Sequence, residues 1–304
     1  MTGGEVRGRG TACARAALAG NPSDGYGGAV LAVTVPALRA EAWAQRRVAN
    51  ESCTIEPPSE AVEATVRRFA RLLAPDAATA ALRWRTSVPR GVLLGGSSAI
   101  VISTLRALCE LQGVTLAPEE LASFALEVET VELQIAAGLQ DRVAQAHGKL
   151  TFMEFGLDRR HEPLPPSLLP PLLIAWRPDA AQESDDVHRS LRTRFERGEG
   201  CISEAMAELA QLARAARDVL WAGDRERFAG AVDGSFDARR RVLLLDQRHV
   251  EMVDRARALG ASANYTGSGG AIVAVCGSER HREQVARGLR QIGCETLPVL
   301  IEGD

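Results

Sequence analysis

The chain has 304 residues, of which 46% are hydrophobic and 25% charged, and its 36 basic and 39 acidic side chains give a net charge of −3. This composition is typical of a soluble globular protein and excludes a disordered one. It provides no basic surface for nucleic acid or an anionic membrane. One basic residue, Lys149, is a lysine and 35 are arginines. A Schiff-base enzyme would depend on Lys149 alone, and Lys149 lies outside any P-loop motif.

The length predicts two domains. No apolar stretch is long enough to cross a bilayer, and the Gly- and Arg-rich start lacks the apolar core of a secretory signal. We therefore expect a cytoplasmic protein with neither membrane nor nucleic-acid partners. The six cysteines contain no C-x-x-C pair and are predicted to be small buried thiols, not a disulfide or zinc framework.

The predicted elements alternate irregularly along the chain, which indicates an α+β fold and not a doubly wound parallel sheet. Apolar residues recur at helical spacing in some segments, and other segments alternate or form short apolar runs. A Pro-rich segment at 163–171 is the predicted linker between domains of residues 11–162 and 172–304. The predicted strands are 13–18, 29–35, 82–87, 172–176, 271–276 and 296–301, and the predicted helices are 60–73, 99–111, 118–136, 202–221, 228–244, 248–259 and 279–291.

Residues 91–98 form a glycine-rich loop that leads directly into a predicted helix. The glycines let the backbone approach a phosphate without Cβ clashes. The N–H groups and the positive end of the helix dipole attract an anion, and no lysine is needed. Ser97 and Ser98 would cap the helix, and one hydroxyl could bind magnesium. The alternative is a loop and a helix cap without a ligand.

Acidic side chains gather between residues 127 and 141. Glu129 and Glu132 lie three residues apart and would share one helix face, and Asp141 follows Gly138, which ends the helix. One carboxylate could hold magnesium, and another could take a proton from an attacking hydroxyl. The alternative is a solvated acidic helix face.

Two further segments could carry chemistry. Arg15 precedes a turn that holds Asp24, where the cation could neutralise charge beside a carboxylate and Asp24 could bind substrate hydroxyls. A structural salt bridge is the alternative. The segment 266–270, before a predicted strand, requires close approach of its backbone to a ligand or to another segment. The histidines have no metal-ligand spacing.

Four motifs stand in one order along the chain: R-x-x-L-x-G-x-x-x-D from Arg15 to Asp24, G-G-S-S-A at 95–99, G-L-Q-D ending at Asp141, and T-G-S-G-G at 266–270. This arrangement resembles the GHMP kinase superfamily, which includes galactokinase, homoserine kinase and mevalonate kinase. The chain is most similar to the glucuronokinase branch, and the segments that carry this similarity are 20–24, 96–101, 138–145, 187–190, 236–241 and 266–271.

The resemblance implies a ribosomal S5 domain 2-like N-terminal domain and a ferredoxin-like C-terminal domain, with the active site between them. It also implies ATP and Mg²⁺ as cofactors and a small-molecule sugar or uronic acid as substrate. The predicted function is therefore that of a sugar kinase that phosphorylates the anomeric hydroxyl of a uronic acid, and D-glucuronate is the first candidate for this acceptor. The alternative within the superfamily is another acceptor, such as galactose, another uronic acid or an amino sugar.

The resemblance also implies roles for individual residues. Asp141 is the catalytic aspartate and Arg15 the basic residue that tunes it, while Ser98 and Glu129, or Glu132 as second choice, are the magnesium ligands. The residues implied for nucleotide binding are Gly91, Leu94, Gly95, Gly96, Ser97, Ser98 and Ala99. Those implied for substrate binding are Asn21, Asp24, Tyr26, Gly267, Ser268, Gly269 and Gly270.

The chain departs from the glucuronokinase pattern after Tyr26, where that branch favours a bulky residue and this chain has Gly27 and Gly28. Its segment between residues 40 and 82 is also shorter than in the plant enzymes. Three arginines are candidates to bind a substrate carboxylate, with a solvated basic helix face as the alternative. They are Arg189, Arg192 and Arg194.

Two other functions compete with a kinase. Ser97 in its loop-to-helix turn, followed in chain order by Asp141 and His249, could indicate a serine hydrolase. However, Ala99 replaces the last glycine of the nucleophile elbow, and no His-Gly-Gly motif is present. A nucleotide-binding module without catalytic activity is the second alternative.

Overall fold

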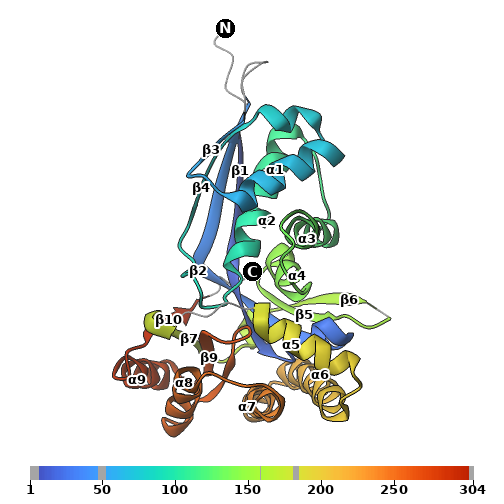
Figure 1. The fold of residues 1–304 in the computed structure, drawn as a ribbon. Coiled ribbons are helices and arrows are strands. Elements are labelled where there is room, and N and C mark those ends of the chain that lie inside the picture. The colour runs from blue at the N-terminus through green and yellow to red at the C-terminus, as the bar shows by residue number, and fades with distance from the viewer. Residues whose placement is uncertain (1–6, 47–52, 158, 181–184, 301–304) are drawn as a thin grey trace. The chain divides into compact units, whose positions relative to one another are not determined.

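The computed structural model describes residues 7–46, 53–157, 159–180 and 185–300 (Figure 1). These residues include no helix with both the length and the hydrophobicity needed to cross a membrane. The chain forms two compact units and passes between them several times. The first unit contains residues 1–14, 37–88 and 95–147, and the second contains residues 15–36, 89–94 and 148–304. The predicted domain limits, residues 11–162 and 172–304, stay predictions.

The first unit is a sheet with helices against one face (Figure 1). The long strand β2 pairs antiparallel with β4, with Ala40 opposite Thr86, and β3 pairs parallel with β4. Helix α2 contacts α1, α3 and α4 and is therefore the central helix of this unit. The elements are β1 (Arg7–Ala19), β2 (Ala29–Gln45), β3 (Thr54–Glu56), β4 (Ala81–Thr86), α1 (Glu60–Leu72), η2 (Pro75–Thr79), α2 (Gly96–Gln112), α3 (Pro118–Glu127), η3 (Val128–Glu132) and α4 (Gln140–His147).

Small residues of β1 set the position of α2. Burial alternates along the first half of β1, and the glycines lie on its buried face. A Cβ atom added at Gly10 would lie 1.9 Å from the carbonyl oxygen of Ser103, and one at Gly8 would lie 2.1 Å from that of Ala107. The backbone of α2 therefore lies directly against the strand, because no side chain separates them. This contact fixes the helix whose N-terminus carries the glycine-rich loop.

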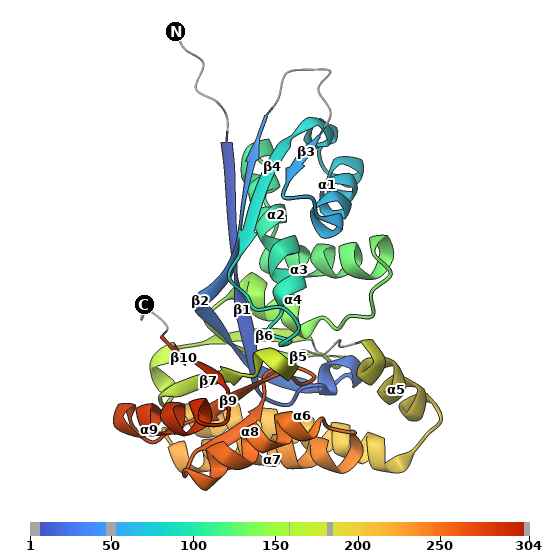
Figure 2. The ribbon, with the colours of Figure 1, turned by 60° about the vertical axis from the view of Figure 1, so that its left-hand side comes forward.

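The second unit contains an antiparallel sheet in the order β10-β7-β9-β8, with Ile174 of β7 opposite both Val273 and Leu297. Helices α7, α8 and α9 pack on this sheet and α6 packs along α7 (Figure 2). The strands are β5 (Leu150–Glu154), β6 (Arg160–Leu164), β7 (Leu172–Trp176), β8 (Ser262–Tyr265), β9 (Ala271–Val275) and β10 (Glu295–Val299). The helical segments are η1 (Ser23–Tyr26), η4 (Pro166–Leu168), η5 (Pro178–Ala180), α5 (Asp185–Glu196), α6 (Gly200–Trp221), α7 (Arg225–Val242), α8 (Gln247–Ala258) and α9 (Glu279–Arg290).

The predicted α+β class is confirmed, and three predicted elements have clearly different limits. Strand β1 begins at Arg7, six residues before the predicted start at residue 13. Strand β2 does not end at residue 35 but continues through Pro36 to Gln45, since its first part pairs with β5 and its second part with β4. The helix predicted over 118–136 ends at Glu127 and continues as the π-helical turn η3. The short elements β3, β5, β6, β8 and α4 were not predicted, because their patterns are shorter than a reliable period. Helix α5 was also not predicted, because its sequence is mostly polar and charged.

The cysteines do not all behave as small buried thiols. Cys276 and Cys294 are buried, and burial raises the pKa of each thiol to about 11. Cys13, Cys53 and Cys109 are partly buried and Cys201 is exposed, so full burial is observed at only two of the six positions and the prediction is wrong at Cys201. It is the second residue of α6, on the side of the first turn that faces solvent.

Substitution of Gly10 by alanine tests the contact between β1 and α2. Because the new Cβ atom would overlap the Ser103 carbonyl, we expect the free energy of unfolding to fall by about 3 kcal/mol or more. The control is Gly230→Ala in α7, where a Cβ atom meets nothing within 4 Å. This control should leave stability unchanged or raise it by up to about 1 kcal/mol. Urea unfolding measures both, and equal stabilities of the two variants would contradict the contact.

Candidate active site

The glycine-rich loop enters α2 without a side-chain cap. Gly95 is the N-cap residue, with φ of 75°, and its left-handed conformation is one that glycine favours. The Ser98 hydroxyl donates to the Gly95 carbonyl at 3.1 Å, and the Ser97 hydroxyl donates to Glu129 Oε1 at 2.7 Å. The prediction that these serines cap the helix is wrong, because the N-cap is Gly95, both serines lie inside the first turn, and no side chain accepts a cap hydrogen bond. N–H groups in the first turn of a helix have no partner within the helix, and such groups can bind an anion.

The Gly95 carbonyl is held by three donors. It accepts hydrogen bonds from the Ala99 N–H at 3.0 Å, the Ser98 hydroxyl at 3.1 Å and the Gln145 side-chain amide at 2.7 Å. In a planar trans peptide the N–H points opposite to the carbonyl, so the Gly96 N–H is directed away from these donors. Gln145 is buried in α4 and also donates to the Cys13 carbonyl at 3.0 Å. Gln145 was not predicted as a site residue, although it lies in the segment 138–145 that carries the similarity to glucuronokinases.

Glu129 lies in the π-helical turn η3 and is 1% exposed. Its Oε1 accepts from Ser97, and its Oε2 accepts from Arg142 through Nε at 2.7 Å and through Nη2. The π turn directs this carboxylate toward the start of α2, and such turns are frequent at functional sites. The structure therefore joins Ser97, not Ser98, to Glu129.

Glu132 has different partners from Glu129. Its carboxylate pairs with three arginines of α1: Arg68 Nη1 at 3.1 Å, Arg71 Nη2 at 2.5 Å and Arg67 Nε at 3.7 Å. The hydrogen bond from Arg71, followed by that from Arg68, holds the pKa of Glu132 below its usual value. The two glutamates do not share a face, because the π turn changes the helical spacing between them.

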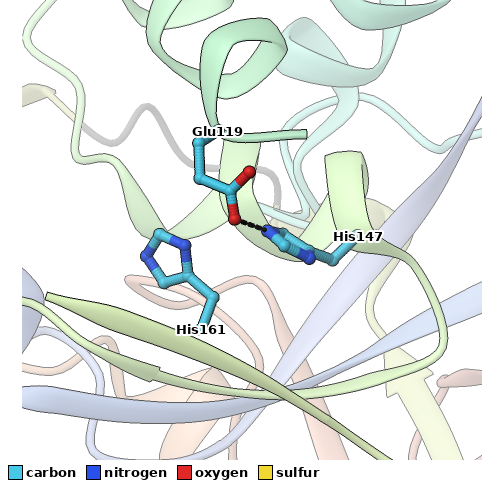
Figure 3. A group of neighbouring side chains, drawn as sticks. All are labelled: Glu119, His147 and His161. Carbon is cyan, nitrogen blue, oxygen red and sulfur yellow. Dashed lines mark ion pairs between the residues drawn. The ribbon is translucent and has the colours of Figure 1, made fainter. Parts of the chain in front are cut away.

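Asp141 is in the first turn of α4, where the helix dipole stabilises a carboxylate. The Gln140 amide donates to Oδ1 at 3.3 Å, and Arg142 Nη1 lies 3.8 Å from Oδ2. Arg142 therefore contacts Glu129 and also lies near Asp141. At the other end of α4, His147 Nε2 lies 3.1 Å from Glu119 Oε1 and joins this helix to α3 (Figure 3).

In the second unit, two buried arginines hold the carbonyl groups of the segment 265–267. Arg15 Nη1 donates to the Thr266 carbonyl at 2.7 Å and to the Leu93 carbonyl at 2.9 Å. Arg239 of α7 donates to the Gly267 carbonyl through Nη2 and lies 3.5 Å from the Tyr265 carbonyl through Nη1. The N–H groups of Gly267 and Ser268 therefore point away from the two guanidinium groups.

Arg239 is a buried cation with unusual partners. It is 1% exposed, and among the described residues it forms no ion pair with a carboxylate. Its guanidinium carbon lies 5.3 Å from the ring centroid of Tyr265. Burial lowers the pKa of Arg239 to about 10, Tyr265 and Asp24 raise it, and Arg15 lowers it further. Arg239 was not predicted as a site residue, although it lies in the segment 236–241 that carries the similarity to glucuronokinases.

The segment 266–270 requires glycine at two positions. A Cβ atom at Gly267 would lie 2.4 Å from the Leu93 carbonyl oxygen, and Gly270 has φ of 73°. The Gly270 N–H donates to Nδ1 of the buried His249 at 3.3 Å, while Nε2 of His249 contacts the Ala180 carbonyl at 2.8 Å. The predicted close backbone approach is therefore to the segment 91–94.

The turn η1 carries Asp24 and Tyr26. The N–H of Gly27, which has φ of 76°, donates to the Asp24 carbonyl at 3.4 Å, and a Cβ atom at Gly28 would lie 2.3 Å from the Ser23 hydroxyl oxygen. Both glycines are thus required by this turn, which accounts for the departure from the glucuronokinase pattern after Tyr26.

The predicted site residues divide between the two units. The first unit holds Gly95, Gly96, Ser97, Ser98, Ala99, Glu129, Glu132 and Asp141. The second unit holds Arg15, Asn21, Asp24, Tyr26, Gly91, Leu94, Gly267, Ser268, Gly269 and Gly270.

Known proteins are similar to this chain in sequence and in fold. Residues 60–149 match the family described as GHMP kinases N terminal domain. The chain is 36% identical over 207 residues to Glucuronokinase 1 of Arabidopsis thaliana, a match that covers 64% of this chain and 57% of that protein. It spans little more than half the length of the curated glucuronokinases it matches.

Solved structures match nearly the whole chain. Lactococcus lactis galactokinase complexed with galactose has a TM-score of 0.83 at 14% identity and covers 98% of this chain and 94% of its own. L. major mevalonate kinase in complex with R-mevalonate has a TM-score of 0.75 at 18% identity, and the match covers 100% of this chain and 98% of that one. At these identities the likeness is one of fold. In sequence over residues 60–149, and in fold over nearly the whole chain, the protein is therefore similar to GHMP kinases.

Proposed function

We propose that the protein is an ATP-dependent sugar kinase that phosphorylates the anomeric hydroxyl of a uronic acid, with D-glucuronate as the first candidate. The observation that carries this proposal is the N-terminus of α2, which has no side-chain cap and has the Ser97–Glu129 pair beside it. The similarity to glucuronokinases supports the choice of acceptor. Another sugar or small-molecule hydroxyl remains the alternative acceptor.

The loop and first turn of α2 would bind the phosphates of ATP. Their N–H groups and the helix dipole provide the positive potential that a lysine supplies in other nucleotide sites. The hydrogen bonds to the Gly95 carbonyl fix the orientation of the Gly96 N–H before a ligand arrives. Most of the rate would come from such positioning, since phosphoryl transfer needs little covalent help from the protein.

Ser97 and Glu129 fit a magnesium ion. Neighbouring ligands of an octahedral Mg²⁺ lie about 2.9 Å apart when each is about 2.05 Å from the ion. The Ser97 hydroxyl oxygen and Glu129 Oε1 are 2.7 Å apart, and Arg142 uses the other carboxylate oxygen. When bound, the ion would neutralise charge on the β- and γ-phosphates. Ser98 is a weaker candidate because its hydroxyl faces the Gly95 carbonyl.

Asp141 would accept or orient the proton of the attacking hydroxyl. Arg142 and the amide of Gln140 orient its carboxylate. Arg15 would act as a positioning residue, because its guanidinium holds the carbonyls of Leu93 and Thr266.

Product analysis tests the proposed function. We expect phosphorus NMR of a reaction with MgATP and D-glucuronate to give a sugar 1-phosphate resonance, with ADP formed in equal amount. The same panel contains galactose, galacturonate and an amino sugar. A sugar 1-phosphate from one of these, with none from glucuronate, would contradict the acceptor and favour the alternative. Binding of MgATP without acceptor-dependent ADP release would contradict kinase activity itself.

Two glutamate substitutions test the magnesium ligand. Glu129→Gln should lower kcat/KM about 100-fold, because it removes a metal ligand and the partner of Arg142. The control Glu132→Gln should keep kcat/KM within about threefold and lower the free energy of unfolding by about 1–3 kcal/mol, through its lost bonds to α1. This stabilisation is present above the unfolded pKa of Glu132, about 4.3, and is lost as pH falls through its lowered folded pKa. A larger activity loss in the control would reverse the assignment.

A third pair of variants tests Arg239, which donates hydrogen bonds to carbonyl groups of the segment 265–267. Arg239→Met should lower kcat/KM roughly 10- to 100-fold, because the Gly267 carbonyl loses its donor and the loop shifts. The neighbouring control is Arg240→Met, which removes an exposed charge 3.8 Å from Asp254. Steady-state kinetics on both variants, after a check of folding by urea unfolding, gives the comparison. Wild-type kinetics for a folded Arg239→Met variant would contradict this role.

A further inference from the structure

The structure distinguishes among the three arginines that could bind a substrate carboxylate. Arg194 is already engaged, since its Nε donates to Glu199 at 2.9 Å and its Nη1 to the Val242 carbonyl at 2.7 Å. The side chain of Arg189 lies outside the described residues. Arg192 is exposed and forms no ion pair with the described carboxylates.

Arg192 is held against the turn η1. Its Nη2 donates to the Gly25 carbonyl at 3.1 Å, and its guanidinium carbon lies 5.1 Å from the ring centroid of Tyr26. The Tyr26 ring packs in turn on Phe195 of the same helix, with 4.5 Å between ring centroids. A guanidinium fixed by a carbonyl and an aromatic face loses little further freedom when it binds a ligand.

The remaining donors of Arg192 suit a carboxylate. A guanidinium has five N–H donors in a planar fork, and one of the two Nη2 hydrogens is used by Gly25. Burial raises the pKa of Tyr26, and of the charged groups that act on it Arg192 lowers the pKa while Asp24 and Glu196 raise it, so the charges near this ring have both signs. The turn therefore presents a fixed cation close to Asp24, the residue assigned to sugar hydroxyls.

We propose that Arg192 is the specificity-determining residue that binds the carboxylate of a uronic acid whose hydroxyls are bound by Asp24. This inference rests on the proposed function. It identifies the Arg192 guanidinium as the group that distinguishes an acidic sugar from a neutral one. A bidentate, charge-assisted pair would form with the carboxylate, and a neutral sugar has no such partner.

The test compares Arg192→Gln and Arg192→Lys with the wild type on glucuronate and on MgATP. We expect Arg192→Gln to raise the KM for glucuronate tenfold or more, the scale of a lost charged hydrogen bond, and to leave the KM for MgATP within twofold. Arg192→Lys keeps the positive charge but not the planar fork of N–H donors, so its rise in KM for glucuronate should be intermediate. The control is Arg197→Gln, which removes the same charge from an exposed arginine further along the chain.

A direct measurement separates recognition from a structural role. Calorimetry should show weaker glucuronate binding for Arg192→Gln, and circular dichroism and urea unfolding should match the wild type. Equal rises in KM for glucuronate and MgATP would indicate only a structural role and overturn the proposal, as would an equal effect of Arg197→Gln. If the wild type phosphorylates glucuronate and Arg192→Gln does so equally well, only this inference fails. If the wild type phosphorylates only neutral sugars, the proposed acceptor fails with it.

Discussion

The site depends on one arrangement of the backbone, in which buried donors hold the carbonyl groups of two glycine segments. In the first unit the Gly95 carbonyl accepts hydrogen bonds from Ala99, Ser98 and Gln145. In the second unit Arg15 and Arg239 hold the carbonyls of the segment 265–267. A peptide N–H points opposite to its carbonyl. Each set of donors therefore fixes the direction in which the N–H groups of these peptides point.

This arrangement would let the chain bind phosphate with a single lysine. Lys149 has φ of 53°, a left-handed conformation that favours glycine, and its carbonyl accepts a hydrogen bond from the Thr34 N–H at 2.8 Å. Its backbone therefore belongs to the turn before β5. In the proposed site, peptide N–H groups at the start of a helix would supply the positive potential instead, and they cost no side-chain entropy when a ligand binds.

The same arrangement places charges where they are unfavourable for folding. Arg239 is buried against carbonyls and an aromatic ring, and a buried cation without a carboxylate loses hydration that neutral acceptors replace only in part. Arg142 and Glu129 form a buried pair, whose Coulomb attraction is offset by the desolvation of both groups. Groups of this kind are expected at functional sites, where local rules of stability are relaxed.

The sequence predicted the parts of the site that depend on local pattern. The glycine-rich loop and α2 were predicted because helical spacing follows directly on a run of glycines. The assignment of hydroxyls was less accurate, because successive residues of a helix point about 100° apart and a small shift of the start exchanges Ser97 and Ser98. The π turn has no local signature, so the different partners of Glu129 and Glu132 were not predicted.

Residues that act across long sequence separations could not be predicted. Gln145 and Gly95 are 50 positions apart, and Arg239 and Gly267 are 28 apart. A single glutamine or arginine in a helix does not by itself indicate a functional site, so neither Gln145 nor Arg239 could be identified from its residue type. From the sequence, Arg192 and Arg194 were equal candidates to bind a substrate carboxylate. The structure distinguishes them, because Arg192 contacts the turn η1 and Arg194 donates to the Val242 carbonyl.

Binding of the phosphates by backbone N–H groups at the start of α2 is tested most directly by the amide resonances of Gly96, Ser97 and Ser98 in a nitrogen–proton NMR titration of the deuterated protein. The titrant is a non-hydrolysable ATP analogue with magnesium. We predict that these three amides shift downfield together, at the analogue concentration that saturates the protein. Saturation by the analogue with these resonances unmoved would contradict the account.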